Sequence, residues 1–473
     1  MHKRAAAFLA ALLALGLAAP SLACASGGAH LDGGALTVWW VLPFACMLLS
    51  IALLPLVLPS LWHHHYGKIA VFWGLCFLVP CAVQFGAGLA LYELQHTIIL
   101  EYIPFLILLF ALFTISGGVR VAGDVEGSPA VNTGILAIGT LLASLMGTTG
   151  ASMLLIRPLL RANQDRTYKI HTVVFFIFLV SNIGGSLTPL GDPPLFLGFL
   201  KGVDFFWTTR HMTHIMLFNS AILLALYYVV EKRLLKKEGR VKAPEAVREP
   251  IRIEGVLNLL LLCGVVGAVL MSGLWKPDVD FPVGQMRVAL QDLARDGSLL
   301  ALAGISWLAT PRQTRLDNEF SWDPIVEVGK LFFGIFVSMI PAIAVLKAGQ
   351  NGALSPVISL VSHEGAPVNH MYFWLSGILS SFLDNAPTYL VFFNTAGGDA
   401  QVLMNQLPAT LAAISCGSVF MGANSYIGNA PNFMVRSIAE SQGVKMPSFF
   451  GYMAWSSGIL VPLFVVDTFL FFL

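Results

Sequence analysis

The stretch Ser181-Asn182-Ile183-Gly184-Gly185-Ser186-Leu187-Thr188-Pro189-Leu190-Gly191-Asp192-Pro193-Pro194 interrupts an apolar segment that otherwise runs from residue 171 to residue 200. Glycine and proline at this density do not sustain a helix, so the backbone must unwind inside the segment. The freed amide and carbonyl groups then need polar partners or water, which lipid does not offer. We therefore predict a helix that is broken at mid-membrane, next to a polar cavity.

Composition places the whole chain in a membrane. Of its 473 residues, 56% are hydrophobic and 11% are charged, and the mean hydropathy is +0.77. A soluble domain carries roughly 25% charged residues. The net charge is +1 and the basic residues are scattered over short loops, so we expect no nucleic-acid partner. The six cysteines follow neither a disulfide framework nor a metal-binding spacing. We predict an all-α membrane protein.

The termini and the basic loops suggest an orientation. Lys3 and Arg4 precede an apolar run, and Ala23-Cys24-Ala25 has the small-x-small form of a cleavage site, so residues 1–25 form a signal peptide or a first anchor helix. The loops at 157–169 and 232–252 are rich in arginine and lysine and should face the cytoplasm.

Two further apolar segments, at 133–157 and 370–397, carry polar residues at their centres. The orientation set by the basic loops holds only if neither segment crosses the membrane. Each should enter and return on one side as a re-entrant hairpin. The first hairpin then opens to the cytoplasm and the second to the outside.

A shift of 237 positions reveals an internal repeat. It places Thr188-Pro189-Leu190-Gly191-Asp192-Pro193-Pro194-Leu195-Phe196 on Ser425-Tyr426-Ile427-Gly428-Asn429-Ala430-Pro431-Asn432-Phe433. The same shift places the centre of the first hairpin on the centre of the second. We predict an inverted repeat of about five transmembrane helices plus one re-entrant hairpin per half, with broken helices. The halves are residues 26–231 and 253–473, joined by a cytoplasmic linker at 232–252.

The breaks and hairpin centres supply the candidate binding residues. Carbonyl, hydroxyl and carboxylate oxygens together suit an alkali cation, and an ionisable side chain at mid-membrane is a functional candidate by default. For Asp192, Asn429 and Asp384 the alternative is helix capping alone. The candidates for binding a cation, a proton or the substrate are Thr148, Thr149, Ser181, Asn182, Thr188, Asp192, Asp384, Asn385, Thr388, Asn424, Ser425 and Asn429. Those for sodium are Asn182, Asp192, Asp384, Asn385 and Asn429.

These motifs resemble the ion transporter superfamily. The run from Ser181 to Asp192 looks most like the Ser-Asn-x-Gly-Gly-x-x-Thr-Pro-x-Gly-Asp run of the D-type sodium:proton antiporters, and Leu383-Asp384-Asn385-Ala386-Pro387-Thr388 is similar to their Asp-Asn-x-Pro-Thr hairpin. The chain also resembles the bacterial putative citrate transporter family. The resemblance implies a homodimer with a fixed scaffold and a moving transport domain that carries the hairpins and broken helices.

The resulting hypothesis is a secondary active transporter that exchanges sodium or lithium for protons across the bacterial inner (plasma) membrane. The alternative is sodium- or proton-coupled transport of citrate or a dicarboxylate. Ile183, where the carboxylate symporters have threonine, disfavours this alternative, as does the lack of arginine or lysine in the predicted core. A third possibility is a non-transporting receptor or scaffold. We expect no enzymatic activity and no cofactor beyond the sodium ion. The expected partners are membrane lipid, a small ion or anion as substrate, and a second copy of the chain.

Overall fold

The computed structural model describes residues 30–123, 126–239, 250–284 and 286–473, and nearly all regular structure in these ranges is helical. The segment predicted as a signal or anchor, 1–25, lies outside the described residues. So do residues 240–249 of the predicted linker. Of the rest of that linker, residues 232–238 continue the preceding helix and residue 252 begins a strand.

The first half forms five membrane-crossing paths and one hairpin within the described residues. The paths are α2, α3, the continuous run α4–η3–α5, the broken pair α8–α9, and α10; the hairpin is α6–α7. Their bounds are α2 (Leu42–Val57), α3 (Pro59–Phe85), α4 (Ala87–Thr97), η3 (Ile98–Tyr102), α5 (Ile103–Ser116), α6 (Pro129–Met146), α7 (Thr148–Ala162), α8 (Ile170–Leu179), η4 (Ile183–Leu187), α9 (Pro193–Leu200) and α10 (Trp207–Glu238). Short turns η1 (Gly33–Ala35) and η2 (Val38–Val41) precede them.

The second half repeats this plan in the same order. Its paths are α11, α12, α14, the broken pair α19–α20, and α21–η7; its hairpin is α16–α17. The bounds are α11 (Val256–Leu274), α12 (Leu290–Ala309), α13 (Arg312–Asp317), α14 (Asp323–Lys347), η5 (Gly349–Asn351), α15 (Ser355–Val361), α16 (Asn369–Phe382), α17 (Asn385–Thr395), α18 (Ala400–Asn405), α19 (Pro408–Phe420), η6 (Met421–Asn424), α20 (Ala430–Ser441), α21 (Phe449–Asp467) and η7 (Thr468–Phe472).

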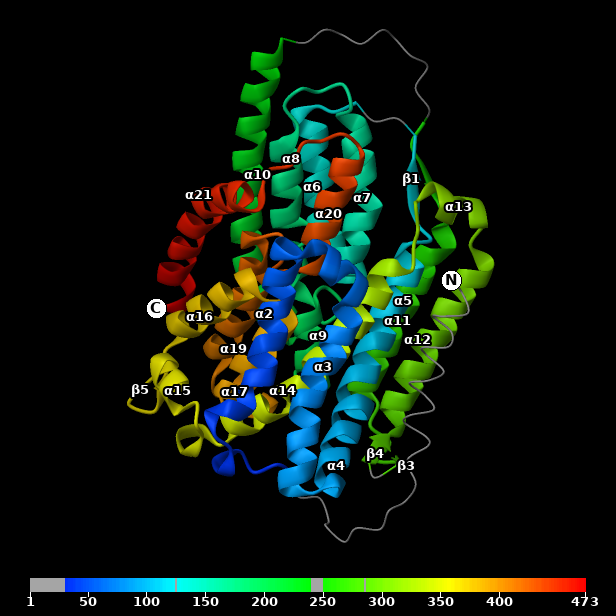
Figure 1. Ribbon diagram of the computed structural model, residues 1–473. Coiled ribbons are helices and arrows are strands. Elements are labelled where there is room, and N and C mark those ends of the chain that lie inside the picture. Colours follow the sequence, from blue (N-terminus) through cyan, green and yellow to red (C-terminus); the bar gives the residue numbers. More distant parts are fainter. Residues whose placement is uncertain (1–29, 124–125, 240–249, 285) are drawn as a thin grey trace.

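Strands occur only as three short antiparallel pairs in the described loops. They are β1 (Arg120–Ala122) with β2 (Arg252–Glu254), β3 (Asp280–Val283) with β4 (Met286–Ala289), and β5 (Ser362–His363) with β6 (Ala366–Pro367). The β1–β2 pair holds the segment after the linker against the loop between α5 and α6 (Figure 1).

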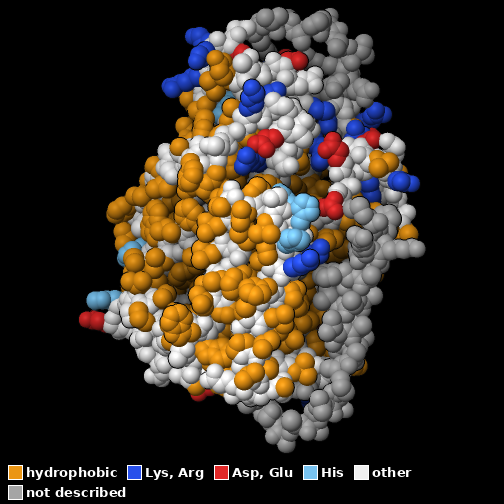
Figure 2. All heavy atoms as spheres, viewed as in Figure 1, with side chains coloured by type: hydrophobic (Ala, Val, Ile, Leu, Met, Phe, Trp, Pro, Cys, Tyr) orange, Lys and Arg blue, Asp and Glu red, His pale blue; other side chains and the backbone are white. Residues whose placement is uncertain are grey.

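Nine helical stretches among the described residues are long and apolar enough to cross a membrane; they include α6 of the first hairpin but neither α12 nor the broken pair α19–α20. Figure 2 shows apolar side chains covering the middle and lower part of one face, whereas lysine, arginine, aspartate and glutamate gather towards the upper end. That upper end is the one predicted to be cytoplasmic. The prediction of an all-α membrane protein is confirmed.

The two segments with polar centres form the expected hairpins. In the first, the backbone N–H of Gly127 donates to Ala162 O (2.8 Å), so the start of α6 and the end of α7 lie together. The side chains of Asn132 and Asn163 also bond to each other in both directions. In Figure 1, α6 and α7 lie above the breaks and α17 lies below them, so the hairpins enter from opposite ends.

The broken helices also run in opposite directions. The chain descends through α8 to α9 and ascends from α19 to α20 (Figure 1). The halves interlock, because α14 packs on α3 and α12 packs on α5. The hydroxyl of Tyr102, in the third path of the first half, donates to Gly329 O in α14 (2.7 Å).

A buried ionic network fixes the upper end of α10. The Glu231 carboxylate is fully buried and accepts hydrogen bonds from Arg166 Nη1 (2.7 Å) and Asn132 Nδ2 (3.0 Å), and its other oxygen lies 2.5 Å from His171 Nε2. Burial by itself lowers the pKa of the Arg166 guanidinium, but its hydrogen bonds to Glu231 and Glu238 outweigh burial and raise that pKa. The network ties α10 to the first hairpin and to the start of α8.

Replacing Glu231 with alanine should therefore destabilise the fold. It leaves the buried His171 without its carboxylate and leaves Arg166 with Glu238 alone, and breaking a buried pair in this way costs about 3–5 kcal/mol. Thermal unfolding of the purified protein in detergent should show a marked fall in Tm. The matched control is Glu440→Ala, which removes an exposed i,i+4 partner of Arg436 and should cost about 0–1 kcal/mol. Equal Tm values for the two variants would contradict the structural role of Glu231.

Candidate functional site

Each break is held to its own hairpin by the same set of hydrogen bonds. In the first half Ser144 Oγ donates to Gly184 O (2.5 Å), Thr188 Oγ1 donates to Ser144 O, and Leu190 N donates to Thr188 Oγ1 (3.2 Å). A shift of 237 reproduces all three in the second half: Ser381 Oγ to Met421 O (3.0 Å), Ser425 Oγ to Ser381 O (2.5 Å) and Ile427 N to Ser425 Oγ (3.2 Å). The repeat thus extends to individual atoms, and the hydroxyls of Thr188 and Ser425 shape the breaks.

The glycines of the breaks allow two segments of backbone to come into direct contact. A Cβ on Gly191 would overlap the carbonyl oxygen of Gly185, and a Cβ on Gly428 would lie 2.5 Å from the carbonyl oxygen of Gly422. These pairs are again related by the shift of 237. The chain therefore crosses itself inside each break at a point where only glycine fits. The crossing fixes the position of the next residue, Asp192 or Asn429.

Asp192 lies where the two halves meet. It is 1% exposed, and its Oδ1 accepts hydrogen bonds from Thr148 Oγ1 (3.0 Å) and Asn429 Nδ2 (3.0 Å). Its Oδ2 accepts one from Asn385 Nδ2. Thr148 and Asn385 are equivalent residues of the two hairpin tips, and Asn429 is the equivalent of Asp192 itself. One buried carboxylate thus collects a donor from both hairpins and from the other break.

The side chains that donate hydrogen bonds to this carboxylate are all neutral. No basic side chain of the described residues is paired with Asp192. The helices α7, α9, α17 and α20 all begin at the cluster, at Thr148, Pro193, Asn385 and Ala430. Their N-termini carry partial positive charge and partly offset the charge of the carboxylate. This arrangement can hold a cation on the carboxylate, or a proton in its place.

Asparagines extend the cluster into the first break. Asn429 Nδ2 also approaches Ser181 O (3.1 Å) and Asn182 Oδ1 (3.3 Å), and Asn182 Nδ2 donates to Asn432 Oδ1 (2.7 Å). Asn182, Asn429 and Asn432 are all buried. They supply amide and carbonyl groups from both halves within hydrogen-bond reach of one another.

Asp384 lies one residue before Asn385, at the tip of the second hairpin. Its carboxylate caps α17 by accepting from Ala386 N (3.1 Å), and the residue is half-buried. Beside it, Asn385 Oδ1 is buried and has no hydrogen-bond partner within the described part of the chain. An unpartnered buried acceptor next to a carboxylate is a free ligand for a cation.

A cavity of about 100 Å³ opens beside Asp192. The first hairpin tip and the first break line one wall, with Thr148, Thr149 and Asp192 among the lining residues. Apolar residues of α5, α14 and α20 line the rest. The cavity lies between the hairpin-bearing part of the molecule and the helices packed against it, so it offers a space for an ion to reach the carboxylate.

Comparison with known proteins identifies the family. A family model described as "Putative citrate transport" matches residues 33–472. The chain belongs to this citrate transport family. It is also 25% identical over 330 residues to an uncharacterized transporter of Mycobacterium bovis and to one of Mycobacterium tuberculosis. Each alignment covers 68% of this chain and 72% of the relative. The protein is therefore a multi-pass membrane protein of a transport family.

In this member of the citrate transport family, the predicted site residues fall into two groups. Thr148, Asn182, Asp192, Asn385 and Asn429 lie in the polar cluster, together with the carbonyl of Ser181. The others bond elsewhere or only approach the cluster: Thr188 and Ser425 bond to hairpin carbonyls, Asn424 Nδ2 donates to Ser381 Oγ (3.0 Å), Thr388 Oγ1 donates to Asp384 O (3.0 Å), Asp384 Oδ1 accepts from Ala386 N (3.1 Å), and Thr149 lines the cavity.

Sequence reasoning missed two members of the cluster. Asn432 also donates to Gly422 O (2.8 Å) and Ser425 O (2.9 Å), so it joins the second break to Asn182. Ser152 Oγ lies 3.0 Å from Ser181 Oγ. The repeat could have indicated Asn432, because the equivalent position in the first half is occupied by the apolar Leu195.

Proposed function

We propose that this protein is a secondary transporter of the bacterial inner membrane that exchanges sodium or lithium for protons. The observation that carries the proposal is the Asp192 carboxylate, which is 1% exposed and surrounded by neutral donors from both halves. An ionised carboxylate without a counter-ion is energetically unfavourable when it is buried at mid-membrane. Binding of either a proton or a small cation lowers its free energy. Binding of one excludes the other, and this competition couples the two fluxes.

The residues around Asp192 fit a sodium ion in chemical type. Both carboxylate oxygens, Thr148 Oγ1 and the unpartnered Asn385 Oδ1 are hard oxygen ligands. If the side-chain amide group of Asn385 rotates by half a turn, its carbonyl oxygen takes the position in which its N–H group now donates to Asp192. The same side chain can therefore support the empty carboxylate or bind a cation held by it. Asn182 and Asn429 can change role in the same way.

Asp384 provides a second carboxylate beside the first. Because it caps α17, whose first residue Asn385 bonds to Asp192, a change of charge on Asp384 acts directly on the cluster. Asp384→Asn should therefore reduce sodium-driven proton movement to background. The assay reconstitutes the protein in proteoliposomes with an internal pH dye and adds sodium.

The control for this variant is Asp399→Asn, since the exposed Asp399 caps α18 in the same manner and lies outside the cluster. It should transport at the wild-type rate. Full activity of Asp384→Asn would remove Asp384 from the proposed mechanism.

The second candidate function is coupled transport of citrate or a dicarboxylate. Two observations favour it: the family description, and the four helix N-termini that meet at the cluster, which suit a carboxylate. Uptake of labelled citrate into the same proteoliposomes distinguishes the two functions directly.

A further inference from the structure

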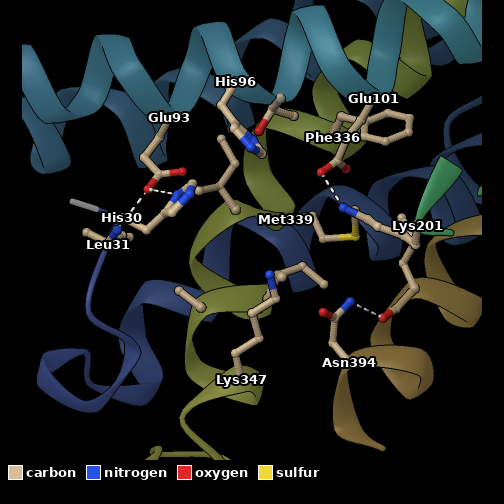
Figure 3. Close-up of a pocket in the computed structure, with 15 residues that line it drawn as sticks. His30, Leu31, Glu93, His96, Glu101, Lys201, Phe336, Met339, Lys347 and Asn394 are labelled. Atoms are coloured by element: carbon tan, nitrogen blue, oxygen red, sulfur yellow. Dashed lines mark hydrogen bonds and ion pairs between the residues drawn. The ribbon is translucent and has the colours of Figure 1, made fainter. Parts of the chain in front are cut away.

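A second polar pocket lies at the opposite end of the molecule from β1 and β2, on the predicted outer side. Its volume is about 110 Å³, enough for several water molecules or a small organic ion. Its lining residues come from the N-terminal segment, α4, η3, α14 and α17, together with Lys201, which directly follows α9 (Figure 3). Among its charged residues are Glu93, Glu101, Lys201 and Lys347.

Each of the two acids of this pocket already has a partner within the protein. Glu93 Oε1 accepts a hydrogen bond from Leu31 N (2.8 Å) and lies 3.2 Å from His30 Nδ1. Glu101 Oε1 lies 2.5 Å from Lys201 Nζ. Lys347, by contrast, is paired with no carboxylate of the described residues, and its ammonium group points towards the middle of the pocket (Figure 3).

Two short helices connect this pocket to the Asp192 cluster. Helix α9 follows Asp192 and ends just before Lys201, and α17 begins at Asn385 and carries Asn394 near its other end. The two helices pack against each other. Eight residues of α9 span roughly 12 Å. A ligand in the outer pocket therefore contacts the far ends of the helices whose near ends hold the cluster.

We propose that the outer pocket binds a small carboxylate anion, with Lys347 and Lys201 as its cationic contacts. The anion meets an unpaired ammonium group and competes with Glu101 for Lys201. Its binding loosens the ion pair that joins α9 to η3, and α9 belongs to the broken helix that positions Asp192. This site is separate from the proposed cation site, and its occupancy does not depend on sodium–proton exchange.

The test is calorimetric titration of the purified protein in detergent with succinate as its choline salt, in sodium-free buffer. Wild type should bind saturably. Lys347→Gln should weaken binding by about 10-fold, the loss expected for one charge-assisted hydrogen bond. Glu101→Gln should tighten binding by about 3-fold or more, because it removes the internal competitor for Lys201. The control, Lys276→Gln on an exposed loop of the same side, should bind as wild type.

Each alternative result overturns the proposal. Absence of saturable binding to wild type, or unchanged affinity in Lys347→Gln, excludes the site. Weaker binding in Glu101→Gln means that the ion pair supports the pocket rather than competing with the ligand. If sulfate displaces succinate at equal concentration, the assignment to carboxylates is wrong. Because no gradient or sodium is present, failure of sodium–proton exchange would leave every one of these results unaffected.

Discussion

Asp192→Asn is expected to abolish sodium-dependent proton movement. The substitution keeps the shape of the side chain but removes the charge on which the proton and the cation compete. A unit charge at about 4 Å in an effective dielectric of about 20 is worth about 4 kcal/mol, so sodium affinity should fall on the order of 1,000-fold. Asparagine also places an N–H donor where Thr148, Asn385 and Asn429 already donate.

The measurement is the initial rate of proton release after a sodium pulse, in proteoliposomes of matched protein content. Asp204→Asn serves as the control, because Asp204 is exposed in the loop after α9 and lies outside the cluster. It should retain the wild-type rate. A thermal unfolding curve for each variant separates loss of transport from loss of fold. Wild-type sodium dependence in a folded Asp192→Asn protein would contradict the assignment of the carboxylate.

Gly191→Ala is expected to have the largest effect on stability among substitutions in the breaks. The new methyl group would overlap the carbonyl of Gly185, and backbone cannot move aside as a flexible side chain can. Overpacking of this kind costs about 3 kcal/mol. Gly428→Ala, at the equivalent crossing in the second half, should behave in the same way.

Unfolding in detergent, followed by temperature or denaturant, measures this cost. The matched control is Gly134→Ala in α6, where a methyl group meets no atom within 4 Å. It should be neutral or stabilising by up to about 1 kcal/mol, since alanine favours a helix over glycine. A Gly191→Ala protein as stable as the Gly134→Ala protein would show that the backbone does not cross at Gly185.

Most of the fold could be predicted because the polar residues of this chain stand out against apolar sequence. Glycine, proline and aspartate between 181 and 194 have no place in a continuous span, and the repeat at 237 positions places the second break and both hairpins. The packing of α3 on α14 and of α12 on α5 could not be predicted, because no pattern in the sequence of either helix identifies its partner.

The site was predictable in residue type but not in orientation. Thr188 and Ser425 were expected to face the ion, yet both donate to hairpin carbonyls. Irregular backbone has no period from which the direction of a side chain follows. The outer pocket was not predicted either, because Glu101, Lys201 and Lys347 are far apart in the sequence.

The most direct test of sodium–proton exchange by this protein is uptake of radioactive sodium into proteoliposomes with an acidic interior. Protons leaving through the protein should drive sodium inward against its gradient. Lithium should compete with sodium, potassium should not, and Asp192→Asn should show no uptake. If the pH gradient drives no sodium uptake while labelled citrate accumulates in the same vesicles, the polar cluster around Asp192 does not exchange sodium for protons.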